Sequence, residues 1–135
     1  MGINAMFLDA CAIIYLIEGN DEKSNCIRQL VSDYLDNSAG VIFVSSLSIL
    51  ECLVLPKKQN DVKLIEEYEV FFASEGVQII DISRAVLYLA IDLRAKYSIR
   101  TPDALQLASA LSRDVKFVSA DKDLAKVTDC EIIML

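Results

Sequence analysis

The sequence predicts an α/β protein in which helices cover both faces of a parallel sheet. Short runs rich in β-branched and aromatic residues alternate with longer runs of helical periodicity, which is typical of this class. A hydrophobic content of 54% and a mean hydropathy of +0.40 suit strands that are buried on both faces. The 135 residues contain no internal repeat or linker, so we expect a single domain over residues 1–135.

In the first half of the chain, turn residues divide two strands from four helices. Gly19 and Asn20 stop the first helix, and Gly40 precedes the second strand. Ser45 and Ser46 are both suitable caps for the third helix. The predicted elements are a strand over residues 3–8, helices over residues 10–18 and 22–37, a strand over residues 41–44, a helix over residues 45–55, a loop over residues 56–60 and a helix over residues 62–73.

In the second half, helix again separates each strand from the next, so we expect right-handed crossovers. Gly76 precedes the third strand, and Ser83 caps the helix that follows it. Thr101 as cap, followed by Pro102, is a strong helix start. The predicted elements are a strand over residues 77–80, helices over residues 83–97 and 101–112, a strand over residues 116–118, a short helical turn near Asp123 and a strand over residues 131–134.

Composition excludes several kinds of chemistry. The chain has no histidine, which removes Ser-His-Asp and Cys-His catalysis and the common zinc hydrolase sites. Its net charge of −7 creates no basic field for nucleic acid, unless the acids gather at a site that a cation neutralises. The cysteines at positions 11, 26, 52 and 130 lack C-x-x-C spacing, and we expect all four to be reduced thiols in the core.

The longest apolar stretches are too short, or contain too many hydroxyls, to span a bilayer. The N-terminus lacks the charge and cleavage pattern of a signal peptide. We therefore expect a cytoplasmic protein that does not contact membranes.

Four acidic residues follow strands or lie on the helices that start there, which is where parallel sheets bind ligands. Asp9 follows the first strand, and Asp121 follows the fourth, with Asp123 as a near equivalent. Glu51 is a lone carboxylate on an apolar helix, and Asp103 lies in the first turn of the helix over residues 101–112. Four neighbouring carboxylates repel one another unless a cation is present, and oxygen ligands suit Mg²⁺ or Mn²⁺.

Each acid also has a purely structural explanation. Asp9 is a suitable helix cap, and Ser48 with Glu51 fits a capping box. Asp103 is favoured by the helix dipole, and Asp121 suits a turn. Asp81 also follows a strand, and we expect only helix-start chemistry from it if that strand lies at the sheet edge.

Four motifs resemble those of the PIN-domain family, in particular its VapC-type toxins of bacterial and archaeal toxin–antitoxin pairs. They span nearly the whole chain in the family's order: residues 7–16, FLDACAIIYL; residues 44–51, VSSLSILE; residues 100–110, RTPDALQLASA; and residues 117–124, FVSADKDL. One position departs from the family pattern. Ala10 stands where the family usually has Ser or Thr, so a hydroxyl that would orient a metal-bound water or a phosphate is missing.

The resemblance implies a three-layer α/β/α sandwich with a five-stranded parallel sheet of order 3-2-1-4-5. It also implies an endoribonuclease that depends on Mg²⁺ or Mn²⁺, with Asp9, Glu51 and Asp103 as core acids and Asp121 as the fourth. A metal-activated water would hydrolyse the phosphodiester bonds of RNA. The basic side chains that could contact phosphates are Arg100, Lys122, Lys57 and Lys58, although ordinary solvated surface also explains the last two.

A toxin of this family implies two partners, a cognate antitoxin and a second copy in a homodimer. The antitoxin would cover the site and an apolar groove between the early helices. Tyr15, Tyr68, Phe71 and Phe72 look exposed enough to line such a groove, although a helical core explains them equally well.

Two other functions remain compatible with parts of the sequence. Ala10 is compatible with a non-catalytic PIN module that only binds partners. A phospho-accepting receiver module also places acids at strand ends. It is disfavoured because Asp9 is single, and because Asp81 alone leaves Glu51 and Asp103 without a role.

Overall fold

The computed structural model describes residues 5–36 and 40–135 and has the predicted architecture. A parallel sheet of order β3-β2-β1-β4-β5 forms its middle layer. The strands are β1 (Ala5–Leu8), β2 (Val41–Ser45), β3 (Val77–Ile80), β4 (Lys116–Ser119) and β5 (Ile132–Met134). The helices are α1 (Ala10–Glu18), α2 (Glu22–Asp36), α3 (Ser46–Lys58), α4 (Val62–Phe72), α5 (Arg84–Lys96), α6 (Thr101–Ser112) and the short 3₁₀ helix η1 (Lys122–Lys126). The predicted start of the first strand at Ile3 and end of the second helix at Asn37 lie outside the described residues.

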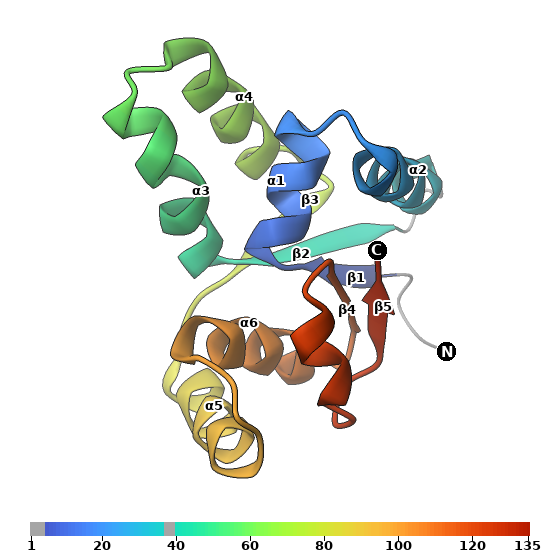
Figure 1. The fold of residues 1–135 in the computed structure, drawn as a ribbon, viewed down its shortest axis with the longest axis vertical. Helices are drawn as coiled ribbons and strands as arrows, with labels where there is room; N and C mark the ends of the chain where they lie inside the picture. Colours follow the sequence, from blue (N-terminus) through green and yellow to red (C-terminus); the bar gives the residue numbers. More distant parts are fainter. Residues whose placement is uncertain (1–4, 37–39) are drawn as a thin grey trace.

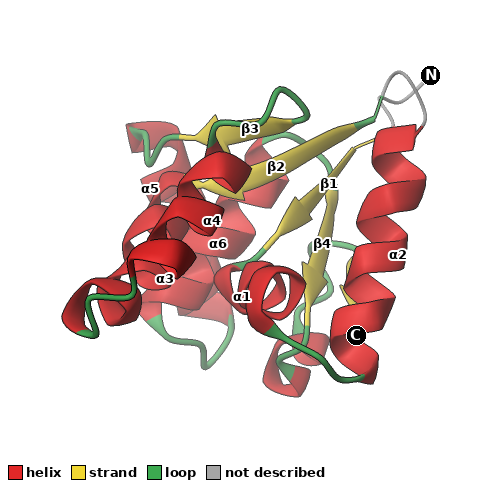
Figure 2. Cartoon of the chain, turned by 90° about the horizontal axis from the view of Figure 1, so that it is seen from above, coloured by secondary structure: helices red, strands yellow, loops and turns green. Residues whose placement is uncertain are grey.

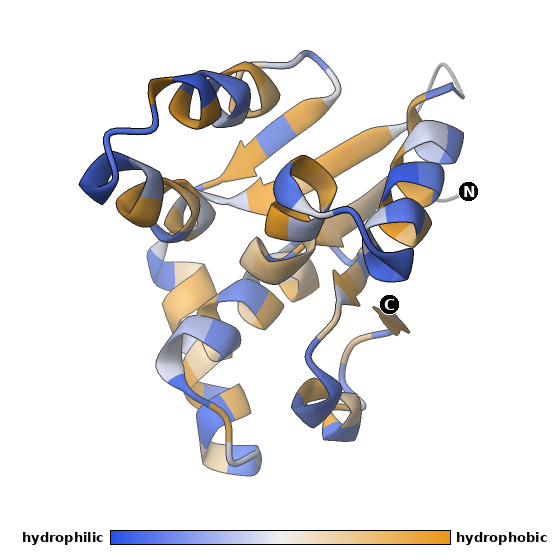
Figure 3. Ribbon diagram, turned by 45° about the horizontal axis from the view of Figure 1, so that its top comes forward, coloured by the Kyte–Doolittle hydropathy of each residue, from blue (hydrophilic) through white to orange (hydrophobic). Residues whose placement is uncertain are grey.

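Helices cover both faces of the sheet. Helices α1 to α4 lie on one face, and α5 and α6 lie on the other (Figures 1 and 2). Two apolar cores result, one on each side, and the strands between them are hydrophobic along almost their whole length (Figure 3). On the α5–α6 side, Phe7 of β1 stacks on Phe117 of β4 with ring centroids 5.5 Å apart. This contact joins the neighbouring strands β1 and β4, which Asp9 and Asp121 follow.

Strand β3 lies at the edge of the sheet, as the prediction for Asp81 requires. Asp81 is exposed, and Ser83 caps α5 by accepting a hydrogen bond from the backbone N–H of Val86 at 3.2 Å. Receiver modules have the strand order 2-1-3-4-5. The observed order excludes that alternative.

The predicted loop over residues 56–60 is wrong in its first half, because α3 continues through Pro56 to Lys58. The proline ring is buried, and its apolar contacts offset the backbone hydrogen bond that proline cannot donate. The chain turns at Asn60, which has a φ of 52°, and the N–H of Asp61 donates to the Pro56 carbonyl at 3.0 Å. The helix therefore ends at the turn around Asn60 and not at the proline.

The predicted cap of α6 is also wrong. Arg100 is the N-cap residue and makes no side-chain capping bond. The hydroxyl of Thr101 accepts instead from Arg94 Nη1 at 2.9 Å, and Arg94 Nε donates to the Ile99 carbonyl at 3.1 Å. Arg94 therefore holds the segment before α6. The helix has its predicted bounds, but Thr101 is its first helical residue and not its cap.

Burial contradicts one further prediction in part and decides between the two explanations offered for another. Cys52 and Cys130 are buried free thiols as predicted, whereas Cys11 and Cys26 are exposed, so the prediction of four core thiols is wrong for these two. Among the aromatic residues that looked exposed, Tyr68 and Phe72 belong to the core and Tyr15 and Phe71 are half-buried. The core explanation is therefore correct for Tyr68 and Phe72. In the described part of the chain, no helix is long and apolar enough to cross a membrane.

Candidate active site

One pocket of about 660 Å³ contains all four predicted acids. It lies where β1 and β4 end and where α1 and α6 begin, with α3 on a third side. Its lining residues are Asp9, Ala10, Cys11, Ile14, Tyr15, Glu51, Arg100, Asp103, Gln106 and Asp121. The acids come from four separate segments of the chain, and only the fold brings them together.

Asp9 is the most buried of the four, with 6% of its surface exposed. It follows β1 and caps α1, since its Oδ1 accepts from the backbone N–H of Ala12 at 2.8 Å. Burial raises the pKa of Asp9 from 3.8 to about 6, hydrogen bonds from Ser119 and Ala12 oppose the rise, and the charges of Asp103 and Asp121 add to it. In the described part of the chain, no basic side chain forms an ion pair with Asp9.

Glu51 lies in the middle of α3. Ser45 caps this helix by accepting from the N–H of Leu47 at 3.1 Å, so a capping box of Ser48 and Glu51 is excluded. Glu51 is an exposed residue, and its Oε1 accepts a part-buried hydrogen bond from Gln106 Nε2 of α6 at 3.0 Å.

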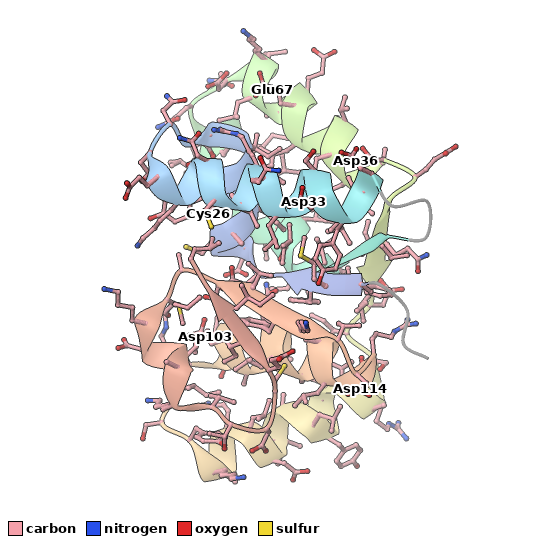
Figure 4. The ribbon with its side chains drawn as sticks, turned by 90° about the vertical axis from the view of Figure 1, so that its right-hand side faces the viewer. Cys26, Asp33, Asp36, Glu67, Asp103 and Asp114 are labelled. Atoms are coloured by element: carbon pink, nitrogen blue, oxygen red, sulfur yellow. The ribbon has the colours of Figure 1, made fainter. Side chains whose placement is uncertain are left out.

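Asp103 is the third residue of α6, and 22% of its side chain is exposed. Burial raises the pKa of Asp103, the nearby Arg100 opposes this, and Asp121 and Asp123 add to the rise. Arg100 Nε lies 3.5 Å from Asp103 Oδ2, and the Arg100 side chain is 80% exposed, so this ion pair is screened by water. Figure 4 labels Asp103 on the side of the sheet opposite α2, the helix of Cys26.

Asp121 follows β4 and caps η1, because its Oδ1 accepts from the N–H of Asp123 at 3.0 Å. Its own N–H donates to Ser119 Oγ at 3.0 Å. Asp123 is exposed and does not line the pocket. The geometry therefore favours Asp121 over Asp123 as the fourth acid.

The chemistry of the pocket fits a hard divalent cation. Its acidic side chains offer oxygen atoms as possible ligands, and among the described residues no basic side chain pairs with the buried carboxylate of Asp9. Within the described residues, no group of three or more possible ligands stands close enough to hold an ion in its present position. The acids are close enough for their charges to raise the pKa of Asp9 and of Asp103, but they do not form a complete coordination shell.

Three polar residues that line the pocket or lie next to its lining residues were not predicted as part of the site. Gln106 of α6 and Ser48 of α3 are buried polar side chains, each three residues from an acid. Ser119 is fully buried and contacts both Asp9 and the segment of Asp121. Buried polar groups at helical spacing from a candidate ligand could have indicated the first two.

The fold and the pocket define an α/β sandwich with an acidic, oxygen-lined site at the carboxyl end of its central strands. The model of the PIN domain family matches residues 6–129, and the chain therefore belongs to the PIN-domain family. No curated protein sequence matches the chain.

Several solved structures share this fold. A toxin–antitoxin complex from Klebsiella pneumoniae is 22% identical, with a TM-score of 0.73 and 96% of each chain covered. VapBC2 from Rickettsia felis, bound to a DNA fragment from its promoter, is 17% identical, with a TM-score of 0.78. The match covers 97% of this chain and 98% of that chain. VapC20 of Mycobacterium tuberculosis, described as a sarcin-ricin loop cleaving toxin, is 14% identical, with a TM-score of 0.70. The match covers 93% of this chain and 98% of that chain. The predicted PIN-like fold is confirmed.

Proposed function

We propose that this chain is a metal-dependent endoribonuclease and the toxin of a toxin–antitoxin pair. The observation that best supports this proposal is the convergence of four carboxylates from separate segments on one pocket of about 660 Å³. Membership in the PIN-domain family and the fold shared with toxin structures support it further.

Asp9, Glu51 and Asp103 would hold Mg²⁺ or Mn²⁺, directly or through water, and Asp121 would complete the ligand set. Such an ion supplies a water of lowered pKa and positive charge against the phosphate. One of the carboxylates accepts the proton of the attacking water. Neutralisation of the pocket also lets an anionic substrate approach a chain of net charge −7.

Arg100 is the basic side chain that lines the pocket, and its exposed guanidinium is suited to a phosphate of the substrate. Lys122 follows Asp121 directly and is exposed, so it also suits a phosphate contact. Lys57 and Lys58 lie in the last turn of α3, and we assign them no role in catalysis.

RNA is the proposed substrate because VapC20, which has the same fold, cleaves the sarcin-ricin loop, which is RNA. An antitoxin is the proposed partner because solved neighbours are toxin–antitoxin complexes. A pocket of about 530 Å³ lies between α1, α2 and α4, and we propose it as a docking place for the antitoxin. It differs from the predicted apolar groove, because it contains none of the four predicted aromatic residues and is lined by Leu16, Ile17, Val70 and the charged Arg28, Lys63, Glu66 and Glu67. The cytoplasm is the proposed location, since a toxin of this kind acts on cellular RNA.

Exposed apolar side chains on α3 and α5 support the proposed homodimer. Leu50 and Leu55 of α3 are 61% and 59% exposed, and Tyr88 and Ile91 of α5 are 63% and 58% exposed. Side chains of this kind in water favour burial against a second surface.

A non-catalytic PIN module is the second candidate, because Ala10 lines the pocket without the usual hydroxyl. Cleavage of single-stranded RNA with Mg²⁺ or Mn²⁺ distinguishes the two. We expect the wild-type chain to cleave, Asp9→Asn and Asp103→Asn to be inactive, and Asp81→Asn to cleave as the wild type does. The nuclease proposal is wrong if the wild type shows no metal-dependent cleavage, or if both inactivating substitutions leave it unchanged.

A further inference from the structure

The side chain of Gln106 is buried at the acidic pocket although it has no charge. It is 3% exposed and stands one helical turn beyond Asp103 on α6. A buried side-chain amide needs partners for both hydrogens and for its oxygen. The partners that Gln106 finds all belong to α3.

Gln106 Nε2 donates to Glu51 Oε1 at 3.0 Å and to Ser48 Oγ at 2.9 Å, while Ser48 Oγ lies 3.3 Å from Gln106 Oε1. Both amide hydrogens are therefore used. A carboxylate can only accept hydrogen bonds, so the nitrogen of the amide has to face Glu51. The buried hydroxyl of Ser48 suits either atom of the amide and leaves this orientation undisturbed.

Helices α3 and α6 lie on opposite faces of the sheet (Figure 1). In the part of the chain that the structure describes, the side-chain hydrogen bonds that join these two helices are those of Gln106. Glu51 is exposed and has three rotatable side-chain bonds, so its carboxylate would otherwise sample several directions. Gln106 holds Oε1, and among the described residues no protein group hydrogen-bonds to Oε2, which is therefore available to water or a cation.

We propose that Gln106 is a positioning residue that fixes the Glu51 carboxylate at the acidic pocket for metal binding. This inference rests on the proposed function. Partners that orient a metal ligand typically contribute 10- to 100-fold to metal affinity or activity. A merely structural link between α3 and α6 would affect stability and leave metal affinity unchanged.

The test uses the full chain and has two readouts. Calorimetry measures the affinity for Mn²⁺, and thermal unfolding without metal measures the stability of each variant. Gln106→Leu removes both donors but leaves Ser48 with a buried, unpaired hydroxyl. The double variant Ser48→Ala/Gln106→Leu removes both members of the buried pair, which preserves the fold better. Ser109→Ala is the control, because it removes another buried polar group from α6, bonded only to the Leu105 carbonyl.

We expect both Gln106 variants to bind Mn²⁺ about 10- to 100-fold more weakly, and Ser109→Ala to bind as the wild type does. In a Glu51→Ala background, Gln106→Leu should cause no further loss, because Gln106 acts through Glu51. A folded double variant with wild-type affinity would overturn the inference, as would a full additional loss in the Glu51→Ala background.

RNA cleavage, measured in parallel, separates this inference from the proposed function. A wild-type chain that binds Mn²⁺ through the Gln106–Glu51 pair but cleaves no RNA contradicts the nuclease and supports the positioning role. Active cleavage together with unchanged Mn²⁺ affinity in the double variant supports the nuclease and overturns the positioning role. A wild-type chain without Mn²⁺ affinity overturns both.

Discussion

Replacing Asp9 with Asn removes a buried charge and retains the side-chain oxygen that caps α1 at Ala12. Burial raises the pKa of Asp9 to about 6, so the folded protein binds this proton more tightly than the unfolded chain does. The ionised carboxylate therefore destabilises the metal-free fold. This penalty is absent below pH about 4 and complete above pH about 6. Between these values the folded state binds more protons than the unfolded state, so the free energy of unfolding falls as the pH rises. Asp9→Asn should stabilise the metal-free chain at pH 7.5.

The size of the effect follows from the two pKa values. The folded value is about 6 and the usual value is 3.8, a difference of roughly 2 units. At about 1.4 kcal/mol per unit, the gain approaches about 3 kcal/mol at pH 7.5 and falls to roughly half of that at pH 5. For a chain of this size, about 3 kcal/mol corresponds to an increase in Tm of roughly 6–12 °C.

The measurement is thermal unfolding followed by circular dichroism in EDTA, from pH 5 to pH 8. Asp81→Asn is the matched control, since Asp81 also follows a strand but is exposed, and it should leave Tm unchanged. A variant Asp9→Asn that is less stable than the wild type at every pH would refute the reasoning. That result would mean that Asp9 contributes more as a charged cap than its burial costs.

Three further outcomes are expected. Mg²⁺ at 100 times its Kd should stabilise the wild type by about 2.7 kcal/mol in thermal unfolding, and it should have no effect on Asp103→Asn if that carboxylate is a ligand. In an inactive Asp103→Asn background, Arg100→Ala should weaken RNA binding about tenfold and reduce by about one the slope of log binding constant against log salt concentration. Lys58→Ala is the control and should change neither. Equal losses in the two variants would contradict a phosphate contact at the pocket. Phe7→Ala should lower the free energy of unfolding, measured in urea, by about 3–5 kcal/mol, because it removes a fully buried ring that stacks on Phe117 and leaves a cavity. A loss below about 1 kcal/mol would contradict that packing.

Much of the fold could be predicted from local pattern. Strand β3 and helix α1 have the predicted bounds, because each is delimited by residues whose local chemistry suffices, such as Gly19 after α1. Pro56 shows where local pattern fails. Its place inside α3 depends on burial of the ring against other segments, which no window of sequence around the proline contains.

The candidate site shows the same division. The four acids could be listed from strand ends and helix starts, and the structure places all of them at one pocket. Their environments could not be predicted. Glu51 is exposed because its helix turns this position to the surface, and Gln106 meets it from a segment 55 positions away in the sequence.

The environment of Asp9 also bears on why the residue is charged at all. A helix cap requires a side-chain oxygen, and Asn supplies one about as well as Asp does. The carboxylate adds a charge that burial and its acidic neighbours disfavour, and in the described structure no basic side chain offsets it. A cap alone would be more stable without that charge. A cation bound in the pocket would offset the cost of this buried charge. The same reasoning predicts that the gain in stability of Asp9→Asn over the wild type disappears when Mg²⁺ saturates the wild type.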